Sequence, residues 1–241
     1  MNFRIMTFNI QHGLNFIKLL NKERVIDLDS VVNTIKENNV DVIGLNEVYN
    51  DVNNVVTVEQ AKYISEKLGY NYYYFGQSIT IKETIGYGNA IISKYPLSNF
   101  VVHKIEDPII KDEDVFYESR SIIECNALLN DENIKIFVTH LGLAKSEQQN
   151  GVNKLMELIK DEKTILLGDF NMEEDNDNIK LLSTKIKNNS FLIEGNNKTY
   201  PSNKPNIKID YIFTKNILVK KCEIIKKIVS DHYPVIIDIE I

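Results

Sequence analysis

The stretch LLGDFN at residues 166–171 joins an apolar run to an acid and an amide that lie two positions apart. The apolar run at 164–167 predicts a buried strand that ends at Gly168. If the chain stays extended there, Asp169 and Asn171 point to the same side. The carboxylate could then accept a proton from water, and the amide could donate hydrogen bonds to developing charge. The same letters also fit a strand that ends in a capped turn, so the spacing alone leaves both interpretations open.

Apolar runs of strand length recur on both sides of this stretch. We expect the other strands at 3–10, 40–45, 70–75, 89–92, 100–103, 119–129, 134–139, 209–213, 218–225 and 235–241. A turn at 130–133 would join two of these strands as a hairpin. Many strands with helices set between them indicate two sheets packed together, with helices on the outside.

Three segments carry apolar residues at helical spacing. They predict helices around 28–35, 61–68 and 152–159. Asp27 or Asp29 would cap the first helix, Gly69 would end the second, and Ser146 would cap the third.

The bulk composition is that of an ordinary globular chain. The 241 residues are 43% apolar, and no linker-like stretch divides them, so we expect one domain over residues 1–241. No apolar run reaches the length of a membrane span, and the N-terminus lacks the pattern of a signal peptide, which predicts a cytoplasmic protein. Cys125 and Cys222 are expected to be buried thiols in a reducing compartment, although one disulfide would be allowed.

The net charge is −6. A protein that binds duplex nucleic acid usually gathers a basic surface, and the acidity argues weakly against that function. The strongest basic cluster is explained by a solvated strand face. It consists of Lys220, Lys221, Lys226 and Lys227.

Polar and acidic residues recur where the apolar runs end. Strand ends are the places where a layered α/β fold assembles a site from distant parts of the chain. These residues are Asn9, Glu47, His140, Asp169, Asn171, Asp210, Asp231 and His232.

Several of these residues have two interpretations. Glu47 ends a buried strand and needs either a hard divalent cation or a basic side chain as its partner. The pair Asp231 and His232 precedes Pro234, so it fits either a surface turn or a site at the entry to the last strand. His140 fits a structural histidine, or a phosphate donor if it meets His232 in space. The histidines and cysteines lack zinc-like spacing.

Eight short strings taken in order resemble the endonuclease/exonuclease/phosphatase superfamily. They span almost the whole chain: TFNI (7–10), LNEV (45–48), GNAIIS (88–93), ESR (118–120), VTHL (138–141), GDFN (168–171), IDYI (209–212) and SDHYP (230–234). The resemblance implies a four-layer α/β/β/α sandwich, in which two mixed sheets are flanked by helices.

The resemblance also implies a role for each residue. Mg²⁺ or Mn²⁺ would be held mainly by Glu47, with Asn9 and Asp231 near the metal or its waters. Asp169 would orient or deprotonate the attacking water, Asn171 would bond the transition-state oxygens, and Asp210 would hold the tautomer of His232. His232 would stabilise the pentacovalent phosphate. The remaining implied phosphate contacts are His140, Arg120 and Asn89.

One departure from the family pattern is Asn46, which stands where Gln is more usual. The string THL at 139–141 resembles the deoxyribonuclease I, sphingomyelinase, inositol-polyphosphate phosphatase, deadenylase and tyrosyl-DNA phosphodiesterase branches. The string TYPS at 199–202 resembles small bacterial hydrolases of the superfamily. The expected specificity segments are 11–24, 77–87, 106–117 and 194–208.

Three functions therefore compete. The leading one is a metal-dependent phosphodiesterase or phosphatase, expected to be monomeric, that acts on a small or lipid-linked phosphoester. A nuclease would add a basic, aromatic-lined groove. A non-catalytic binding module that kept the fold is the third. Intact Glu47, Asp169, Asn171, Asp210 and His232 argue against it.

Overall fold

The computed structural model describes residues 1–51, 58–111 and 113–241, and within them twelve strands form two six-stranded sheets. The first sheet has the order β11 (Leu218–Ile224), β12 (Val235–Glu240), β1 (Asn2–Asn9), β2 (Val42–Asn50), β4 (Ile85–Ser93) and β3 (Tyr72–Ile81). The second has the order β5 (Leu97–Lys104), β6 (Ser121–Leu129), β7 (Glu132–His140), β8 (Thr164–Asp169), β10 (Asp210–Lys215) and β9 (Lys187–Asn188).

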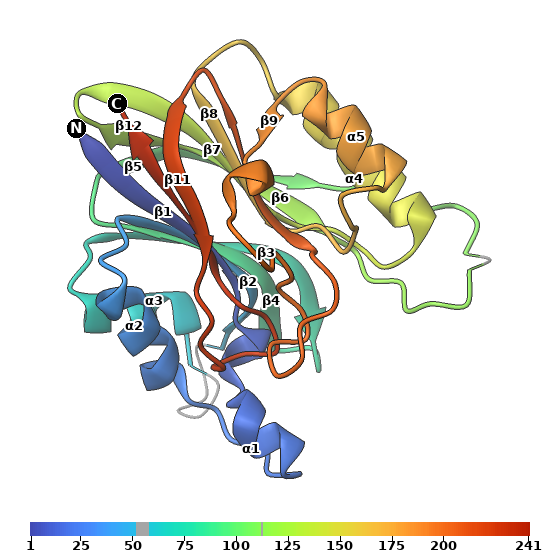
Figure 1. Ribbon diagram of the computed structural model, residues 1–241. Helices are drawn as coiled ribbons and strands as arrows, with labels where there is room; N and C mark the ends of the chain where they lie inside the picture. Colours follow the sequence, from blue (N-terminus) through green and yellow to red (C-terminus); the bar gives the residue numbers. More distant parts are fainter. Residues whose placement is uncertain (52–57, 112) are drawn as a thin grey trace.

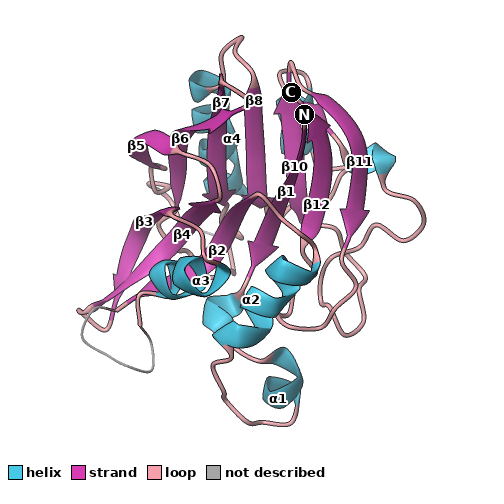
Figure 2. Cartoon of the chain, turned by 90° about the vertical axis from the view of Figure 1, so that its left-hand side faces the viewer, coloured by secondary structure: helices cyan, strands magenta, loops and turns pink. Residues whose placement is uncertain are grey.

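The two sheets pack face to face and carry helices on their outer faces, which confirms the four-layer α/β/β/α arrangement (Figures 1 and 2). Helices α2 (Leu28–Glu37) and α3 (Gln60–Leu68) cover the first sheet, and α4 (Lys145–Leu158) and α5 (Asp177–Ser183) cover the second. Three buried apolar clusters fill the three interfaces between the layers. Both sheets are therefore buried on two sides, which explains why most strands appear in the sequence as continuous apolar runs.

The expected helix ends are confirmed in two cases and wrong in one. Asp27 accepts a hydrogen bond from the Ser30 amide and caps α2, and Gly69 adopts the left-handed conformation that ends α3. Ser146 does not cap the third helix, because α4 begins at Lys145 with Ala144 in the N-cap position. The carboxylate of Glu113, from the loop before β6, accepts hydrogen bonds from the first amides of α4.

Four short helices and one short strand were not expected from the sequence. They are η1 (Gln11–Gly13), α1 (Phe16–Leu20), η2 (Ser190–Leu192), helix α5 and strand β9. Helix α1 projects from the molecule below α2 (Figure 2). The expected β6–β7 hairpin is confirmed, but its turn is only Asn130-Asp131, and both residues have positive φ.

Two parallel strand pairs position the site. Strand β1 pairs with β2 so that Asn9 lies opposite Asn46, and β7 pairs with β8 so that His140 lies opposite Asp169. Because the ends of parallel strands meet at one edge, each sheet presents its polar residues at that edge. Asp210 starts the antiparallel strand beside β8 and faces Asp169 in register.

Tight packing between the sheets requires a glycine at one point. A Cβ built on Gly44 of β2 would collide with the Leu167 side chain of β8 in the facing sheet. The sheets therefore approach closely just behind the strand ends that carry the polar residues.

Cys125 and Cys222 are both buried and free. Within the part of the chain that the structure describes, no helix combines the length and apolarity that a membrane crossing needs.

Candidate active site

A β-bulge in β2 aims Glu47 into the site. Leu45 pairs with Ala90 and Val48 pairs with Gly88, so Asn46 and Glu47 together lie opposite the single residue Asn89. Glu47 has φ of +56°, a conformation that a residue other than glycine rarely adopts. Such bulges re-aim a side chain at the edge of a sheet and are frequent beside active sites. Here the bulge turns Asn46 inward and leaves the Glu47 carboxylate partly exposed.

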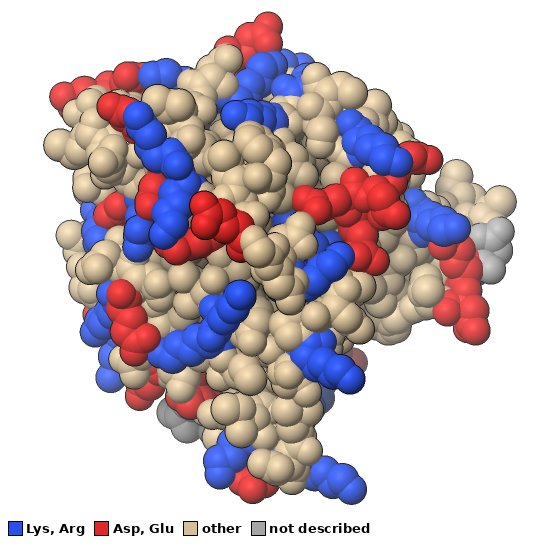
Figure 3. All heavy atoms as spheres, in the orientation of Figure 1, with Lys and Arg blue, Asp and Glu red and all other residues tan. Residues whose placement is uncertain are grey.

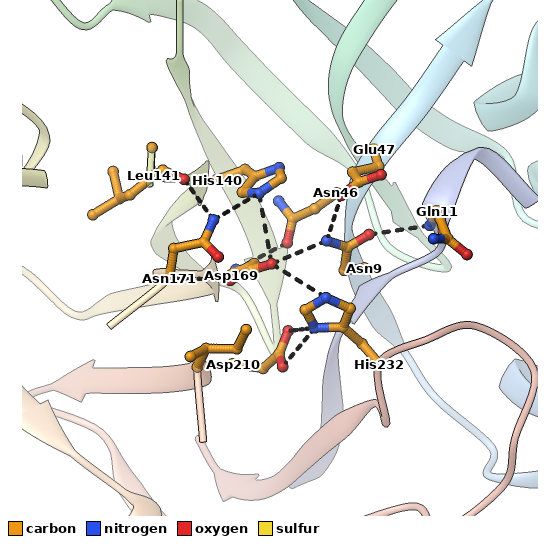
Figure 4. A network of polar contacts seen from close by, with 12 residues as sticks. Asn9, Gln11, Asn46, Glu47, His140, Leu141, Asp169, Asn171, Asp210 and His232 are labelled. Carbon is orange, nitrogen blue, oxygen red and sulfur yellow. Dashed lines mark hydrogen bonds and ion pairs between the residues drawn. The ribbon is translucent and has the colours of Figure 1, made fainter. Parts of the chain in front are cut away.

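Asn9 links the two sheets at the centre of the network in Figure 4. Its amide nitrogen donates to Glu47 Oε1 and to Asp169 Oδ2, both at 3.0 Å. Its amide oxygen accepts the Gln11 backbone N–H at 3.0 Å. Asn9 is fully buried, so these bonds fix the spacing between the two carboxylates.

Asp169 ends β8 and is almost completely buried. One carboxylate oxygen accepts the Asn171 backbone N–H at 3.0 Å, and the other faces Asn9 and both histidines. Burial raises the pKa of Asp169, the charge of His232 counteracts this, and the charge of Asp210 adds to the rise. A carboxylate with a raised pKa is a stronger base than an exposed one.

His232 and Asp210 form a close pair. His232 Nδ1 lies 2.9 Å from Asp210 Oδ2, and His232 Nε2 lies 3.6 Å from Asp169 Oδ2. Burial by itself lowers the pKa of His232, but Asp210 and Asp169 together raise it to about 10. The ring is therefore an imidazolium at neutral pH, held by Asp210 on one nitrogen, and it presents an N–H from the other.

His140 is kept neutral by a different environment. Arg120 Nη1 lies 3.1 Å from His140 Nδ1, and because a guanidinium only donates, Nδ1 must accept and Nε2 must carry the proton. That N–H faces Asp169 Oδ2 at 3.5 Å. Burial, followed by the charges of Arg120 and His232, lowers the pKa of His140 well below its usual value. Two histidines on either side of one carboxylate thus have opposite protonation states, which is typical of acid–base sites.

Asn171 lies on the His140 side. It has φ of +51°, and its amide nitrogen donates to the Leu141 carbonyl at 2.9 Å. The same nitrogen lies 3.2 Å from His140 Nε2. The chain is therefore not extended here: the strand ends at Asp169 in a capped turn, which is the second interpretation that the spacing of GDFN left open. In this turn both side chains lie beside His140.

Glu47 and Asp231 form the other end of the site. Burial raises the pKa of Asp231, His232 opposes the rise, and the nearby Glu47 charge increases it. Gln11 donates to Asp231 Oδ2 at 2.8 Å, while its own amide oxygen is buried without a hydrogen bond among the described residues. Two carboxylates that repel each other beside an unsatisfied amide oxygen fit a hard divalent cation, which prefers oxygen ligands.

A second group of ligand atoms is more compact. Asp169, Asp210 and His232 offer atoms that all lie within 4.8 Å of one another. However, His232 Nδ1 is already committed to Asp210, and an imidazolium has no lone pair for a metal. We therefore regard this group as an acid–base cluster, and the Glu47–Asp231 end as the place that fits a metal.

Arg120 lies beneath His140 and is paired with Glu118, whose Oε1 is 2.6 Å from Arg120 Nη1. Asn89 is almost fully buried, and both of its amide atoms bond inside the protein, to Asn46 and to the Ser121 carbonyl. A phosphate contact of Arg120 remains a prediction. The same holds for Asn89, although its bonds place it under the site.

Gln11 and Lys208 were not identified from the sequence as parts of the site, and Asn46 was noted only as a departure from the family pattern. Asn46 donates to Asn89 and to the Thr139 carbonyl and accepts the Asp169 backbone N–H at 3.0 Å. Gln11 holds Asp231. Lys208 is fully buried behind Asp210 and donates to its carbonyl at 2.6 Å, and burial lowers the pKa of Lys208 to about 8. Gln11 and Lys208 could have been found in the sequence, because each is a polar residue two positions from a predicted site residue, Asn9 or Asp210.

Comparisons with known proteins identify the family and the fold. The sequence matches the model of the endonuclease/exonuclease/phosphatase family over residues 6–232. No curated protein matches significantly.

Solved structures share the fold. An endonuclease/exonuclease/phosphatase from Beutenbergia cavernae has a TM-score of 0.82 and 18% identity, with 100% of this chain and 72% of that chain covered. A family protein from Leptotrichia buccalis has a TM-score of 0.77 and 21% identity, with 99% and 100% covered. The mannosyl-6-phosphatase Bt3783 from Bacteroides thetaiotaomicron has a TM-score of 0.78 and 14% identity, with 99% and 100% covered.

Proposed function

The chain belongs to the endonuclease/exonuclease/phosphatase family, and from that premise we propose that it is a Mg²⁺-dependent hydrolase of small phosphate esters. The observation that carries the proposal is the buried Asp169 carboxylate between a neutral and a charged histidine. This arrangement offers a base for water and two N–H donors for phosphate oxygens side by side.

Glu47 and Asp231 would hold the cation, with Asn9 fixing the position of Glu47. A bound divalent ion would neutralise charge on the phosphate oxygens as a Lewis acid. Mn²⁺ satisfies the same oxygen ligands and is the natural alternative in the assay.

The chain's own residues would do the rest. Asp169 takes the proton of the attacking water as the new P–O bond forms, the ester P–O bond breaks, and the leaving oxygen takes a proton from solvent water. The N–H groups of His232 and His140 then bond the oxygens on which negative charge grows. Asp210 keeps His232 charged through its bond to Nδ1. Among the residues that the structure describes at this site, none is an activated nucleophile, so the proposed reaction needs no covalent intermediate.

The test is turnover of a substrate panel with Mg²⁺, with Mn²⁺ and with EDTA. The panel contains p-nitrophenyl phosphate, bis(p-nitrophenyl) phosphate, sugar phosphates, inositol phosphates, sphingomyelin, single-stranded DNA and RNA. We expect turnover of at least one phosphoester that EDTA abolishes and added Mg²⁺ restores. Turnover that is indifferent to EDTA, or none with either metal, contradicts the proposal.

A nuclease is the second candidate. The net charge is −6, which favours a small substrate over a nucleic acid, and the one face drawn in Figure 3 mixes basic and acidic side chains. Faster cleavage of DNA or RNA than of every small ester in the panel would reverse this preference.

One variant distinguishes a non-catalytic module that kept the fold from the two enzyme hypotheses. If Asp169→Asn folds as well as the parent protein and leaves the biological activity unchanged, this third alternative is correct.

A further inference from the structure

A cavity of about 610 Å³ opens beside the Glu47 end of the site, outside the group of residues that act on the scissile phosphate. His12 belongs to both places, because its Nδ1 lies 3.9 Å from Glu47 Oε2 and its ring lines the cavity. The remaining lining residues come from the α1–α2 segment, β2 and the β3–β4 hairpin: Arg24, Ile26, Tyr49, Ile81, Lys82 and Ile85. All of these residues except Tyr49 fall in or next to two of the segments expected to determine specificity, 11–24 and 77–87.

The wall of this cavity is built by a buried residue. The rings of His12 and Tyr49 stack with centroids 4.5 Å apart. Gln60 of α3, fully buried, donates to the His12 carbonyl at 2.8 Å and accepts the Tyr49 backbone N–H at 2.9 Å. Gln60 therefore fixes the backbone of both stacked residues, and its bond to the His12 carbonyl helps to hold His12 at its positive φ.

The stack in turn positions Arg24. Arg24 Nη2 lies 3.2 Å from His12 Nε2, which must accept because a guanidinium only donates. Among the described residues, neither Arg24 nor Lys82 has a carboxylate within 4 Å. Other lysines near the surface are commonly paired, Lys18 with Glu23 being an example. Two cations without acidic partners thus face one cavity, and one of them is held by a neutral ring.

We propose that this cavity binds a second phosphate group of the substrate. The inference rests on the proposed function and deepens it, because it selects esters that carry a phosphate in addition to the one that is cleaved. Two positive charges match a dianionic phosphate better than a carboxylate with one charge. The planar guanidinium can bond two phosphate oxygens at once, and Lys82 adds a point charge.

The experiment compares kcat/KM for four sugars that differ only in their anions. They are glucose 1,6-bisphosphate, glucose 1-phosphate, glucose 6-phosphate and glucuronic acid 1-phosphate. We expect the bisphosphate to exceed each of the others by about tenfold or more, the effect of one or two charge-assisted hydrogen bonds. If glucuronic acid 1-phosphate has the same kcat/KM as glucose 1,6-bisphosphate, the cavity does not select phosphate over carboxylate, and the proposal is wrong.

Variants test the residues. Arg24→Gln should lower the ratio of bisphosphate to monophosphate kcat/KM by about tenfold, and Lys82→Gln should lower it by a smaller factor. Lys18→Gln, a neighbouring exposed lysine already paired with Glu23, should leave the ratio unchanged. An unchanged ratio in Arg24→Gln, or an equal loss on all four sugars, overturns the proposal.

A binding measurement separates this inference from the proposed function. Calorimetry with glucose 1,6-bisphosphate and Mg²⁺ on Asp169→Asn protein needs no turnover. Binding that weakens about tenfold when Arg24→Gln is added supports the second phosphate site even if no sugar is hydrolysed, in which case only the proposed activity fails. If the bisphosphate binds no tighter than glucose 6-phosphate, the second site is absent.

Discussion

At the scale of single residues, burial gives chemically similar groups different roles. His140 and His232 both approach Asp169, yet burial and Arg120 keep His140 neutral, while Asp210 keeps His232 charged. The sequence indicates that these residues can meet, because each lies at one end of an apolar run, His140 and Asp169 after their strands and His232 before the last one. It does not predict their protonation states, which depend on Arg120 and Asp210 from other strands.

Asp169→Asn should lower kcat by about a thousandfold, because the amide cannot take a proton from water. The folded protein should be as stable as the parent or more so, since burial disfavours the charged carboxylate. Steady-state kinetics and thermal unfolding measure the two effects. Asp175→Asn, an exposed acid beyond Asn171, is the matched control and should change neither.

The pH dependence follows from Asp169 and His232. Because the pKa of Asp169 is raised, the base form increases with pH above the ordinary carboxyl range, and kcat/KM should rise there. Because the pKa of His232 is about 10, the charged ring is lost as pH passes that value, and kcat/KM should fall. In Asp210→Asn the charge that raises the pKa of His232 is removed, so the alkaline limb should move to lower pH. A pH profile at saturating Mg²⁺ measures both limbs, and an alkaline limb that stays in place shows that another group titrates.

At the scale of strands and helices, the sequence predicts what local patterns determine. The long apolar runs and the helix caps at Asp27 and Gly69 lie within a few residues of the elements they define. The bulge at Glu47 was not predictable, because it depends on which strand pairs with β2. Helices α1 and α5 are short, and the Ser146 cap was wrong since distant Glu113 supplies it.

Gly168 tests how β8 places Asp169. It has φ of +151°, and a Cβ there would collide with the Thr139 carbonyl of β7. Gly168→Ala should lower the free energy of unfolding by about 3 kcal/mol and reduce kcat, because both strain and collision occur beside Asp169. Gly195→Ala has a positive φ but open space around it and should cost only about 1 kcal/mol without loss of kcat. Denaturant unfolding measures the free energy of unfolding of both variants. Equal losses would show that the chain relieves the collision between the new Cβ and the Thr139 carbonyl.

At the scale of the whole molecule, the site is shared by two sheets that must keep their relative position. The first sheet supplies Asn9, Glu47 and, from the segment before β12, His232. The second supplies His140, Asp169 and Asp210. The family resemblance predicts this sandwich and which residues converge, but the side-chain contacts across the interface were not predictable from one sequence.

Close packing of the sheets is testable at Gly44. Gly44→Ala should cost about 1 to 3 kcal/mol of stability, because the new methyl group meets Leu167 in a filled interface. Leu167→Ala removes that obstacle at its own cost of about 2 to 5 kcal/mol. The double variant should therefore be more stable than the sum of the two losses predicts. Leu167→Ala combined with the distant Gly195→Ala should be additive, and additivity in both pairs would contradict the packing argument.

The side-chain amide of Asn46 gives this interface its own spectroscopic probe. Its NH₂ group donates one hydrogen bond to the Asn89 side chain and another to the Thr139 carbonyl of the facing sheet. Neither proton can reach solvent while the layers stay together. In ¹⁵N spectra their exchange with deuterium should consequently be as slow as that of the central backbone amides. Faster exchange would show that the two sheets separate beneath Asp169 before the rest of the chain unfolds.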